Sequence, residues 1–203
     1  TEVVLNAIHC WGLEPAIKRF IGMFAFATWD TIKKELFLVR DRLGVKPLYY
    51  QKTPERLIFG SELKALYANP EFRYDLSRRG LEEYFCFGYT SGETTVFKNT
   101  CKLPAGHYLR VLVGGETSLT RYWSLDAVER GSFNGSFEDA VAALTKLSDS
   151  AFGYRLVSDV PVGIFLSGGI DSTFLSAHLK KRAGVDLKHI TIGFDEKAYD
   201  ETP

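Results

Sequence analysis

The sequence predicts an α+β fold of antiparallel sheets with helices, followed by the start of an α/β domain with a parallel sheet. Over residues 22–123, apolar runs alternate with short polar or glycine-containing turns, which is the pattern of β-hairpins. Further along, two apolar runs at residues 162–166 and 188–194 are separated by a helical stretch. Strands that are joined through a helix pair in parallel, so this part predicts a βαβ unit.

The first part begins with helices and a hairpin. Apolar residues recur at helical spacing over residues 1–20, and Gly12 divides this stretch into two short helices. Residues 22–30 form a long apolar run, which predicts a strand buried on both faces. A polar turn then leads to a partner strand at residues 35–39.

Two more hairpins and two helices complete the first part. The hairpins are predicted over residues 48–60 and over residues 106–123, the latter around a Gly-Gly pair. Ser61 is placed to cap a short helix, and residues 76–87 predict a longer one. Five aromatic residues of the strands are expected in the core: Phe24, Phe26, Trp29, Tyr49 and Tyr50.

A change of character near residue 125 predicts two domains. Residues 1–122 carry 17 basic and 13 acidic residues, whereas the rest of the chain carries 8 and 12. Glycine, asparagine, serine and aspartate gather between the two parts, which is typical of a linker. We therefore expect one domain over residues 1–125, a linker over residues 126–136 and a second domain over residues 137–203.

The second domain opens with an amphipathic helix. Ser136 and Asp139 have the spacing of a capping box, in which each side chain bonds the other residue's backbone N–H. Apolar residues then repeat on one face of this helix: Val141, Leu144, Leu147 and Ala151.

The turn before the next helix has the composition of a phosphate-binding loop. Gly168 and Gly169 let the backbone approach a ligand closely. Successive N–H groups at a helix N-terminus form a nest for an anion, and Ser167 and Ser172 add hydroxyl donors. The loop is not a Walker A motif, because it lacks the Gly-Lys-[Ser/Thr] end.

Asp171 lies inside this loop, where an acid repels phosphate unless a cation lies between them. Mg²⁺ is commonly held by one or two carboxylates together with phosphate oxygens, so Asp171 is the candidate metal ligand. The alternative is a plain turn in which Asp171 only caps the helix. The combination of strand, Ser-Gly-Gly-Ile-Asp-Ser and helix favours the functional interpretation.

Composition argues against several other functions. The 25 basic and 25 acidic residues balance, which predicts no nucleic-acid partner and no membrane-surface partner. Cys10, Cys86 and Cys101 have neither CxxC nor Cys/His spacing, which argues against disulfides and zinc and favours the cytoplasm. No apolar run approaches the roughly 18 residues of a membrane span, and no signal peptide is visible.

The loop at residues 167–172 resembles the pyrophosphate loop of the N-type ATP pyrophosphatases, which cleave ATP between the α- and β-phosphates. Other segments are similar to the later half of a class II glutamine amidotransferase domain and to its continuation in glutamine-hydrolysing asparagine synthetases: residues 22–30, 40–50, 61–66, 97–107, 121–123, 159–163 and 192–194. The chain is thereby identified as an internal fragment of that family, with a partial Ntn-type glutaminase and the start of an adenine-nucleotide α-hydrolase-like domain.

The resemblance implies a carbon–nitrogen ligase of amino-acid biosynthesis that uses ATP and Mg²⁺. Glutamine is hydrolysed in the first domain, and the ammonia displaces AMP from an acyl-adenylate in the second. The acceptor is a carboxylate, classically that of aspartate, and the parent protein is expected to be a homodimer. The resemblance assigns adenine to the backbone of Leu166 and Ile192. It assigns pyrophosphate to five residues: Ser167, Gly168, Gly169, Asp171 and Ser172.

One part of the family's machinery is missing from the chain. The glutaminase nucleophile of the family is an N-terminal cysteine, whereas this chain begins with Thr1. None of the three cysteines is expected to replace it, so we assign no catalytic residue and expect no glutaminase activity from the chain alone. Two alternatives stay open: a relative with changed chemistry, such as a β-lactam-synthetase-type cyclase, and a non-catalytic ATP-binding module.

Arg40 and Asp41 lie at a strand end beside Gly44, and their role is open. They could serve the glutamine site or the passage of ammonia, but we favour a salt bridge within the hairpin. The four histidines are scattered and receive no catalytic role: His9, His107, His178 and His189.

Overall fold

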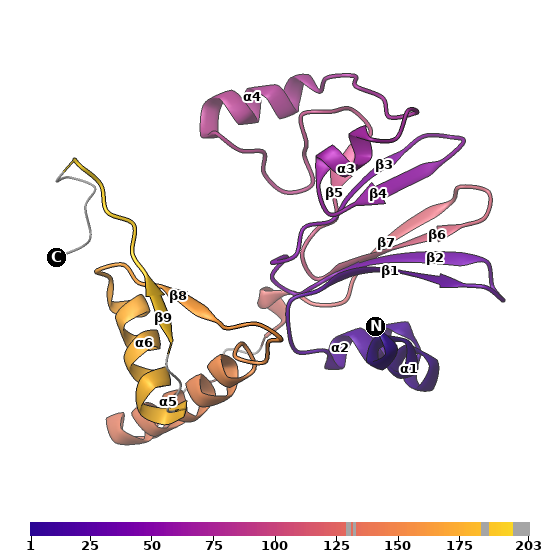
Figure 1. The fold of residues 1–203 in the computed structure, drawn as a ribbon. Coiled ribbons are helices and arrows are strands. Elements are labelled where there is room, and N and C mark those ends of the chain that lie inside the picture. The colour runs from indigo at the N-terminus through magenta and orange to yellow at the C-terminus, as the bar shows by residue number, and fades with distance from the viewer. Residues whose placement is uncertain (129–130, 132, 184–186, 197–203) are drawn as a thin grey trace. The chain divides into compact units, whose positions relative to one another are not determined.

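The computed structural model describes residues 1–128, 131, 133–183 and 187–196. The chain forms two compact units, Thr1–Glu129 and Arg130–Pro203, and each is described by itself (Figure 1). The first unit has antiparallel sheets and the second a parallel pair of strands, which confirms the predicted fold classes. The predicted linker includes residues 129, 130 and 132, which lie outside the described residues, and the domain boundaries stay predictions.

The larger sheet of the first unit has the strand order β1-β2-β6-β7. Its strands are β1 (Ala25–Asp30), β2 (Glu35–Arg40), β6 (His107–Leu112) and β7 (Thr117–Arg121). Both predicted hairpins are confirmed: β1 pairs with β2, and β6 pairs with β7 across Gly114 and Gly115, which both have positive φ. The sequence pattern does not reveal that β6 also pairs with β2, with Glu35 opposite Leu112.

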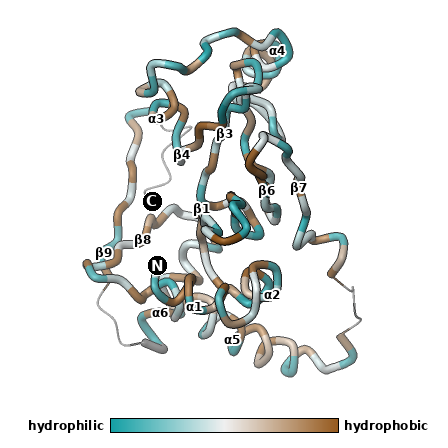
Figure 2. Tube along the Cα trace, turned by 90° about the vertical axis from the view of Figure 1, so that its right-hand side faces the viewer, coloured by the Kyte–Doolittle hydropathy of each residue, from teal (hydrophilic) through white to brown (hydrophobic). Residues whose placement is uncertain are grey.

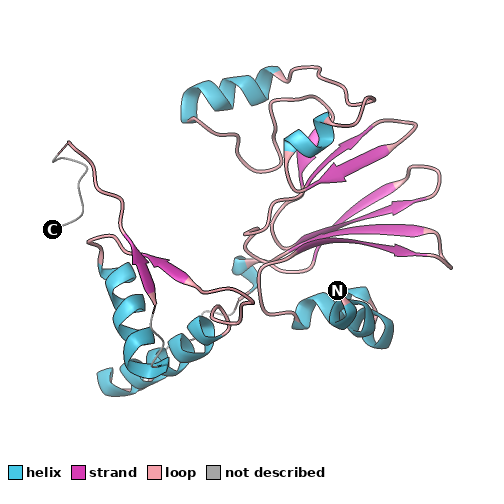
Figure 3. Cartoon of the chain, viewed as in Figure 1, coloured by secondary structure: helices cyan, strands magenta, loops and turns pink. Residues whose placement is uncertain are grey.

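A second sheet has the order β4-β3-β5, with β3 (Tyr49–Lys52) between β4 (Leu57–Gly60) and β5 (Thr100–Lys102). The hairpin of β3 and β4 was predicted, whereas β5 was not. One hydrophobic core joins residues of both sheets: Leu38, Leu48, Tyr50, Leu103 and Leu109. Figure 3 shows the strands of both sheets in magenta.

Two helices, α1 (Glu2–Trp11) and α2 (Leu13–Arg19), begin the first unit on either side of Gly12, as predicted. Ile17 of α2 packs against Val39 and Tyr122 in a second core cluster. Since Leu38 belongs to the other cluster, neighbouring residues of β2 are buried on opposite faces. β2 is therefore covered on both faces, and so is β6, where Leu109 belongs to the first cluster and Tyr108 packs against the second.

The prediction that residues 22–30 form a strand buried on both faces is wrong. β1 is the outermost strand of its sheet in the described part of the chain, and Trp29 remains 47% exposed. Phe24 and Phe26 do pack in the cluster around Ile17, so only the start of the run is covered. An apolar run alone does not distinguish a central strand from an edge strand, because periodicity carries no information about neighbouring strands.

Two helices accompany the smaller sheet. α3 (Leu63–Tyr67) begins after Glu62, so the prediction that Ser61 caps it is wrong by one residue. α4 (Arg78–Phe87) begins after Ser77, whose side chain accepts a hydrogen bond from the Gly80 backbone N–H. A short 3₁₀ turn, η1 (Leu125–Ala127), follows β7.

The second unit contains α5 (Phe137–Gly153), β8 (Gly163–Phe165), α6 (Ile170–Ala183) and β9 (Lys188–Ile190). The predicted capping box is confirmed at Ser136 and Asp139. β8 and β9 pair in parallel with Ile164 opposite His189, which is the predicted βαβ arrangement, although β9 is shorter than expected. The buried cluster of this unit consists of Ile164, Leu179 and Leu187, with Phe152, Leu156 and Leu175 packed against it.

The amphipathic helix is present as α5, but its predicted apolar face is not buried in the described part of the unit. Val141, Leu144 and Leu147 are exposed, and Ser148 is the buried residue of this helix. α5 meets α6 through a different side, where Phe152 lies against Phe174. Figure 2 shows pale to brown colours along much of α5, in keeping with an apolar stripe that the described part of the unit leaves open.

Candidate functional site

The predicted phosphate-binding loop lies between the end of β8 and the start of α6. The backbone N–H of Leu166 donates to the Ile190 carbonyl oxygen (2.9 Å), which extends the parallel pairing by one bond. The Thr191 hydroxyl donates to the Leu166 carbonyl oxygen (2.9 Å). Leu166 and Ile192 therefore lie near the carboxyl ends of two neighbouring parallel strands, where ligands bind in open α/β sheets.

The hydroxyl groups of two serines form hydrogen bonds within the loop at residues 167–172. The Ser172 hydroxyl donates to the carbonyl oxygens of Ser167 (2.8 Å) and Gly169 (3.1 Å). The Ser167 hydroxyl lies 3.1 Å from that of Ser172 and accepts a hydrogen bond from the Gly169 backbone N–H (3.3 Å). The two serines thus bond within the loop and hold its shape, a role that the sequence interpretation did not give them.

Gly169 is constrained by space rather than by its backbone angle. Its φ does not lie in the left-handed region, but a Cβ at this position would lie 3.2 Å from the Ser167 hydroxyl oxygen. A larger residue would therefore disturb the contact that closes the loop. The Thr173 backbone N–H and hydroxyl both donate to the Gly169 carbonyl oxygen (3.2 and 2.9 Å) and anchor the first turn of α6. Thr173 was not singled out in the sequence.

The first turn of α6 offers backbone donors to an anion. The first helical bond is the one from the Thr173 N–H to Gly169, so the N–H groups of residues 170–172 have no acceptor within the helix. The positive end of the helix dipole lies at the same place. Asp171 is exposed in this turn. The loop thus combines unsatisfied N–H groups with one carboxylate, which suits a phosphate accompanied by a cation.

Asp171 is the only site residue proposed as a metal ligand. Among the residues that the structure describes, no three His, Cys, Asp or Glu side chains gather to hold a metal ion. A Mg²⁺ at Asp171 would take its other ligands from phosphate oxygens and water. This donor set fits the ion, because Mg²⁺ keeps several waters and is usually bound by one or two carboxylates with substrate phosphates.

α6 is held in place by contacts with both of its neighbours. His178 on α6 is 9% exposed, and its Nε2 lies 2.8 Å from Oδ1 of Asp149 on α5. The His178 ring also lies edge-on to Phe152 and tilted against Phe174. On the other side, the Ser176 hydroxyl lies 2.5 Å from Nε2 of His189 on β9. Two of the four histidines that appeared scattered in the sequence therefore secure the helix that carries the loop.

The salt bridge predicted between Arg40 and Asp41 is absent from the ion pairs of the described residues. Asp41 is 1% exposed, and its carboxylate instead accepts hydrogen bonds from the backbone N–H groups of Phe24, Leu43, Val45 and Lys46. The Arg40 guanidinium donates to backbone carbonyl oxygens of Lys46, Leu103 and Gly44. Each side chain is satisfied by the backbone, so both shape the loop after β2 rather than pair with one another.

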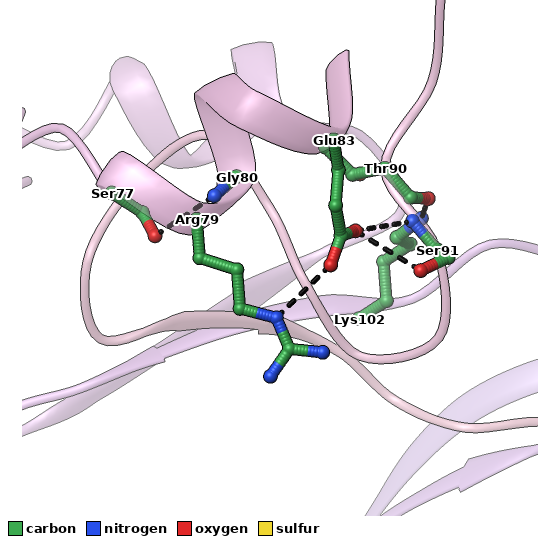
Figure 4. Close-up of polar contacts among 7 residues, drawn as sticks. All are labelled: Ser77, Arg79, Gly80, Glu83, Thr90, Ser91 and Lys102. Atoms are coloured by element: carbon green, nitrogen blue, oxygen red, sulfur yellow. Dashed lines mark hydrogen bonds and ion pairs between the residues drawn. The ribbon is translucent and has the colours of Figure 1, made fainter. Parts of the chain in front are cut away.

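A polar cluster ties the loop after α4 to the helix and to β5, and Figure 4 shows its members: Ser77, Arg79, Gly80, Glu83, Thr90, Ser91 and Lys102. The Glu83 carboxylate accepts hydrogen bonds from the Ser91 backbone N–H (2.9 Å) and hydroxyl (3.0 Å). The Ser91 N–H and the Arg79 guanidinium hold the pKa of Glu83 below its ordinary value. Burial lowers the pKa of Lys102, whose ammonium donates to the Thr90 carbonyl oxygen. Glu83 and Lys102 therefore act as a clamp that holds the loop at Thr90 and Ser91.

The three cysteines lie in different surroundings. Cys10 and Cys86 are exposed, and Cys101 is half-buried. Burial raises the pKa of the Cys101 thiol, which makes it a poor nucleophile at neutral pH. In the described part of the chain, no helix has the length and apolarity that crossing a membrane requires.

Comparison with known proteins gives two family matches in chain order. Residues 1–123 match the family model described as "Glutamine amidotransferase domain", and residues 143–203 match the one described as "Asparagine synthase". Among curated proteins, the chain is 39% identical to asparagine synthetase [glutamine-hydrolyzing] 3 of Bacillus subtilis, over 97% of this chain and 32% of that protein. It is 36% identical to putative asparagine synthetase [glutamine-hydrolyzing] 2 of Methanocaldococcus jannaschii, over 100% of this chain and 39% of that protein.

The chain thus spans between about a third and two fifths of the length of these two relatives. Among solved structures, a glutamine phosphoribosylpyrophosphate amidotransferase from B. subtilis, complexed with ADP and GMP, aligns with a TM-score of 0.39. That alignment has 16% identity and covers 98% of this chain and 41% of the other.

Proposed function

Since the chain belongs to the glutamine-hydrolysing asparagine synthetase family, we propose that the protein containing it is a glutamine-dependent, ATP-dependent ligase. Its reaction is the amidation of a carboxylate, with aspartate converted to asparagine as the leading case. The carboxylate is first joined to AMP with release of pyrophosphate, and ammonia from glutamine then displaces AMP. The two family matches, in the order of the two half-reactions, support this reading.

The proposal rests on the loop between β8 and α6. The backbone of Leu166 and Ile192 receives the adenine at the carboxyl ends of the strands. The phosphates lie against Ser167, Gly168, Gly169 and Ser172, and the free N–H groups of the first turn of α6 point toward them. The observation that carries this assignment is the closure of the loop by the Ser172 hydroxyl, which leaves the loop compact around the helix N-terminus.

Asp171 completes the site by holding Mg²⁺ through its exposed carboxylate. When bound, the ion supplies positive charge between that carboxylate and the phosphates, which otherwise repel each other. A carboxylate oxygen of the acceptor bonds to the α-phosphorus of ATP as the bond to the β-phosphate breaks, and the pyrophosphate leaves held by the backbone donors of the loop. Ammonia then attacks the acyl carbon, and the bond to AMP breaks.

The domain boundaries follow the same proposal. Residues 1–125 belong to the amidotransferase domain, residues 126–136 link it to the synthetase domain, and residues 137–203 begin that domain. The further elements of the proposal are a cytoplasmic location, a homodimeric parent protein, and glutamine and a carboxylate as substrates. A nucleic-acid partner is not part of it, since basic and acidic residues are equal in number.

Exchange of labelled pyrophosphate into ATP, driven by aspartate, tests the adenylation step in the protein that contains this chain. We expect Asp171→Asn to lower the exchange rate by about 10²–10³-fold, the size of effect that loss of one electrostatic group at a reacting centre produces. The matched control is Glu138→Gln, which removes an exposed acid from the first turn of α5 instead. Undiminished exchange in Asp171→Asn refutes the metal role.

The same assay separates the alternatives. ATP binding without exchange for any carboxylate would indicate a non-catalytic ATP-binding module. Exchange that neither glutamine nor ammonia carries forward to an amide would indicate a cyclase such as a β-lactam synthetase. A cysteine at the N-terminus of the mature parent protein, with ammonia release from glutamine, supports the amidotransferase.

A further inference from the structure

The helix that carries the loop is fixed by a partly buried polar contact. His178 lies two turns after Asp171 on α6, and its Nε2 lies 2.8 Å from Oδ1 of Asp149 on α5. Its ring is enclosed by Phe152 (5.4 Å between centroids) and Phe174 (5.3 Å). The His178 side chain is 7% exposed and that of Asp149 is 39% exposed, so the ring is shielded from water while the carboxylate is partly solvated. Burial of the ring strengthens the hydrogen bond.

Apolar packing and this contact constrain α6 differently. Leu175 and Leu179 pack against Ile164 and Leu187, and such contacts tolerate small sliding or rotation of a helix. The hydrogen bond between His178 and Asp149 is satisfied at one rotation and one height of α6 on α5. The second contact, from Ser176 to His189 on β9, lies two residues earlier on α6, about half a turn away, and fixes the other side.

The loop depends on where α6 begins. The Ser172 hydroxyl bonds the carbonyl oxygens of Ser167 and Gly169, so rotation of α6 moves a group that closes the loop. Displacement of about an ångström is enough to weaken a site built from aligned donors. The geometry of the loop is therefore coupled to the contact at His178.

We infer that His178 and Asp149 form a positioning pair that sets α6 so that its N-terminus and the loop at residues 167–172 are ordered for a phosphate-bearing ligand. The inference rests on the proposed function for the identity of that ligand. Neither residue touches the ligand. Both act through the rotation of α6, and no family match assigns them a role.

Two substitutions of His178 separate its ring from its hydrogen bond. His178→Phe keeps an aromatic ring between Phe152 and Phe174 but has no nitrogen to bond Asp149. His178→Gln has no ring but keeps an amide group that can reach the carboxylate. We expect His178→Phe to weaken ATP binding, measured by calorimetry on the whole protein, by about 5-fold, the loss of one hydrogen bond. We expect His178→Gln to bind ATP with nearly the wild-type affinity. We expect Asp149→Ala to weaken ATP binding to a similar extent as His178→Phe.

The double variant His178→Phe, Asp149→Ala decides whether the two residues act as a pair. If they do, the double variant binds ATP no more weakly than either single variant. Leu187→Ala is the control, because it removes packing from the same core without touching the hydrogen bond. We expect Leu187→Ala to lower the melting temperature and to leave the ATP affinity of the folded protein unchanged.

Amide hydrogen exchange tests the inference without any nucleotide. We expect the peptide over residues 166–173 to exchange faster in His178→Phe and in Asp149→Ala, and at the wild-type rate in Leu187→Ala and His178→Gln. Equal exchange in wild type and His178→Phe overturns the inference. Failure of the wild-type protein to bind ATP overturns the proposed function instead, and the exchange rates still decide whether the pair orders the loop.

Discussion

Asp41 offers a direct measure of how the loop after β2 is held. Its Oδ1 accepts hydrogen bonds from the backbone N–H groups of Leu43 (3.1 Å) and Val45 (3.0 Å). Its Oδ2 accepts from those of Phe24 (3.2 Å) and Lys46 (2.9 Å). Asp41→Asn changes one of these acceptors into an NH₂ group, which then faces two N–H donors in a buried site.

The loss of stability in Asp41→Asn follows from the number of backbone N–H donors that lose their acceptor. Each buried N–H left without a partner costs about 1–3 kcal/mol, so Asp41→Asn should destabilise the first unit by roughly 3 kcal/mol or more. For a unit of this size we expect the melting temperature to fall by about 10 °C or more. The amide cannot avoid the cost by turning over, because both oxygens of the aspartate accept two N–H groups.

Tryptophan fluorescence during thermal unfolding measures this effect in the right unit. All three tryptophans, Trp11, Trp29 and Trp123, belong to the first unit, so the second unit does not contribute to the signal. Asp30→Asn is the control, since Asp30 also accepts two backbone N–H bonds but these are exposed to solvent, and water or the remaining oxygen can replace the lost acceptor. Equal melting temperatures for Asp41→Asn and Asp30→Asn would refute the reasoning.

Two other predictions concern α4. Gly80→Ala should destabilise the first unit by about 3 kcal/mol or more, because its Cβ would overlap the Thr95 carbonyl. Gly88→Ala, in open space at φ +76°, should cost about 1 kcal/mol. Urea unfolding measures both losses of stability, and a larger loss for Gly88→Ala would contradict the packing argument. The hydrogen bonds from Ser91 lower the pKa of Glu83 in the folded state, so their stabilisation is complete above the ordinary pKa of 4.5 and is lost as the pH falls through the lowered value. The difference in melting temperature between wild type and Glu83→Gln should therefore shrink on acidification below pH 4.5, and a difference that is constant with pH would exclude the clamp.

The sequence was informative where neighbouring residues decide the structure. The turn around Gly114 and Gly115 and the capping box at Ser136 are local, and both are confirmed. The strand, loop and helix around Ser167 were equally visible, because the glycines and the change of period lie within a few residues of each other. The hydrogen bonds that close this loop also come from nearby residues.

Long-range partners were not visible. The hydrogen bond of Asp149 with His178 joins residues 29 apart, and no local pattern marks either residue. Arg40 and Asp41 suggested an ion pair because opposite charges are adjacent, but buried backbone groups compete for both side chains. The exposure of Trp29 and Leu147 likewise depends on which elements cover them, which periodicity cannot indicate.

The pairing of β2 with β6 has a consequence for how the first unit folds. β2 ends at Arg40 and β6 begins at His107. All three strands of the smaller sheet, β3, β4 and β5, are formed by the chain between them. The Arg40 guanidinium reaches the Leu103 carbonyl oxygen across 63 residues. Pairs so distant in sequence form slowly, since a long loop must close first.

During synthesis, the hairpin of β1 and β2 therefore emerges long before the strand that completes its sheet. In that interval, the edge of β2 that later pairs with β6 offers free backbone N–H and C=O groups beside Leu38 and Val39. Such an edge pairs readily with other chains. The period of greatest risk for aggregation thus ends when β6 has left the ribosome and taken its place beside β2.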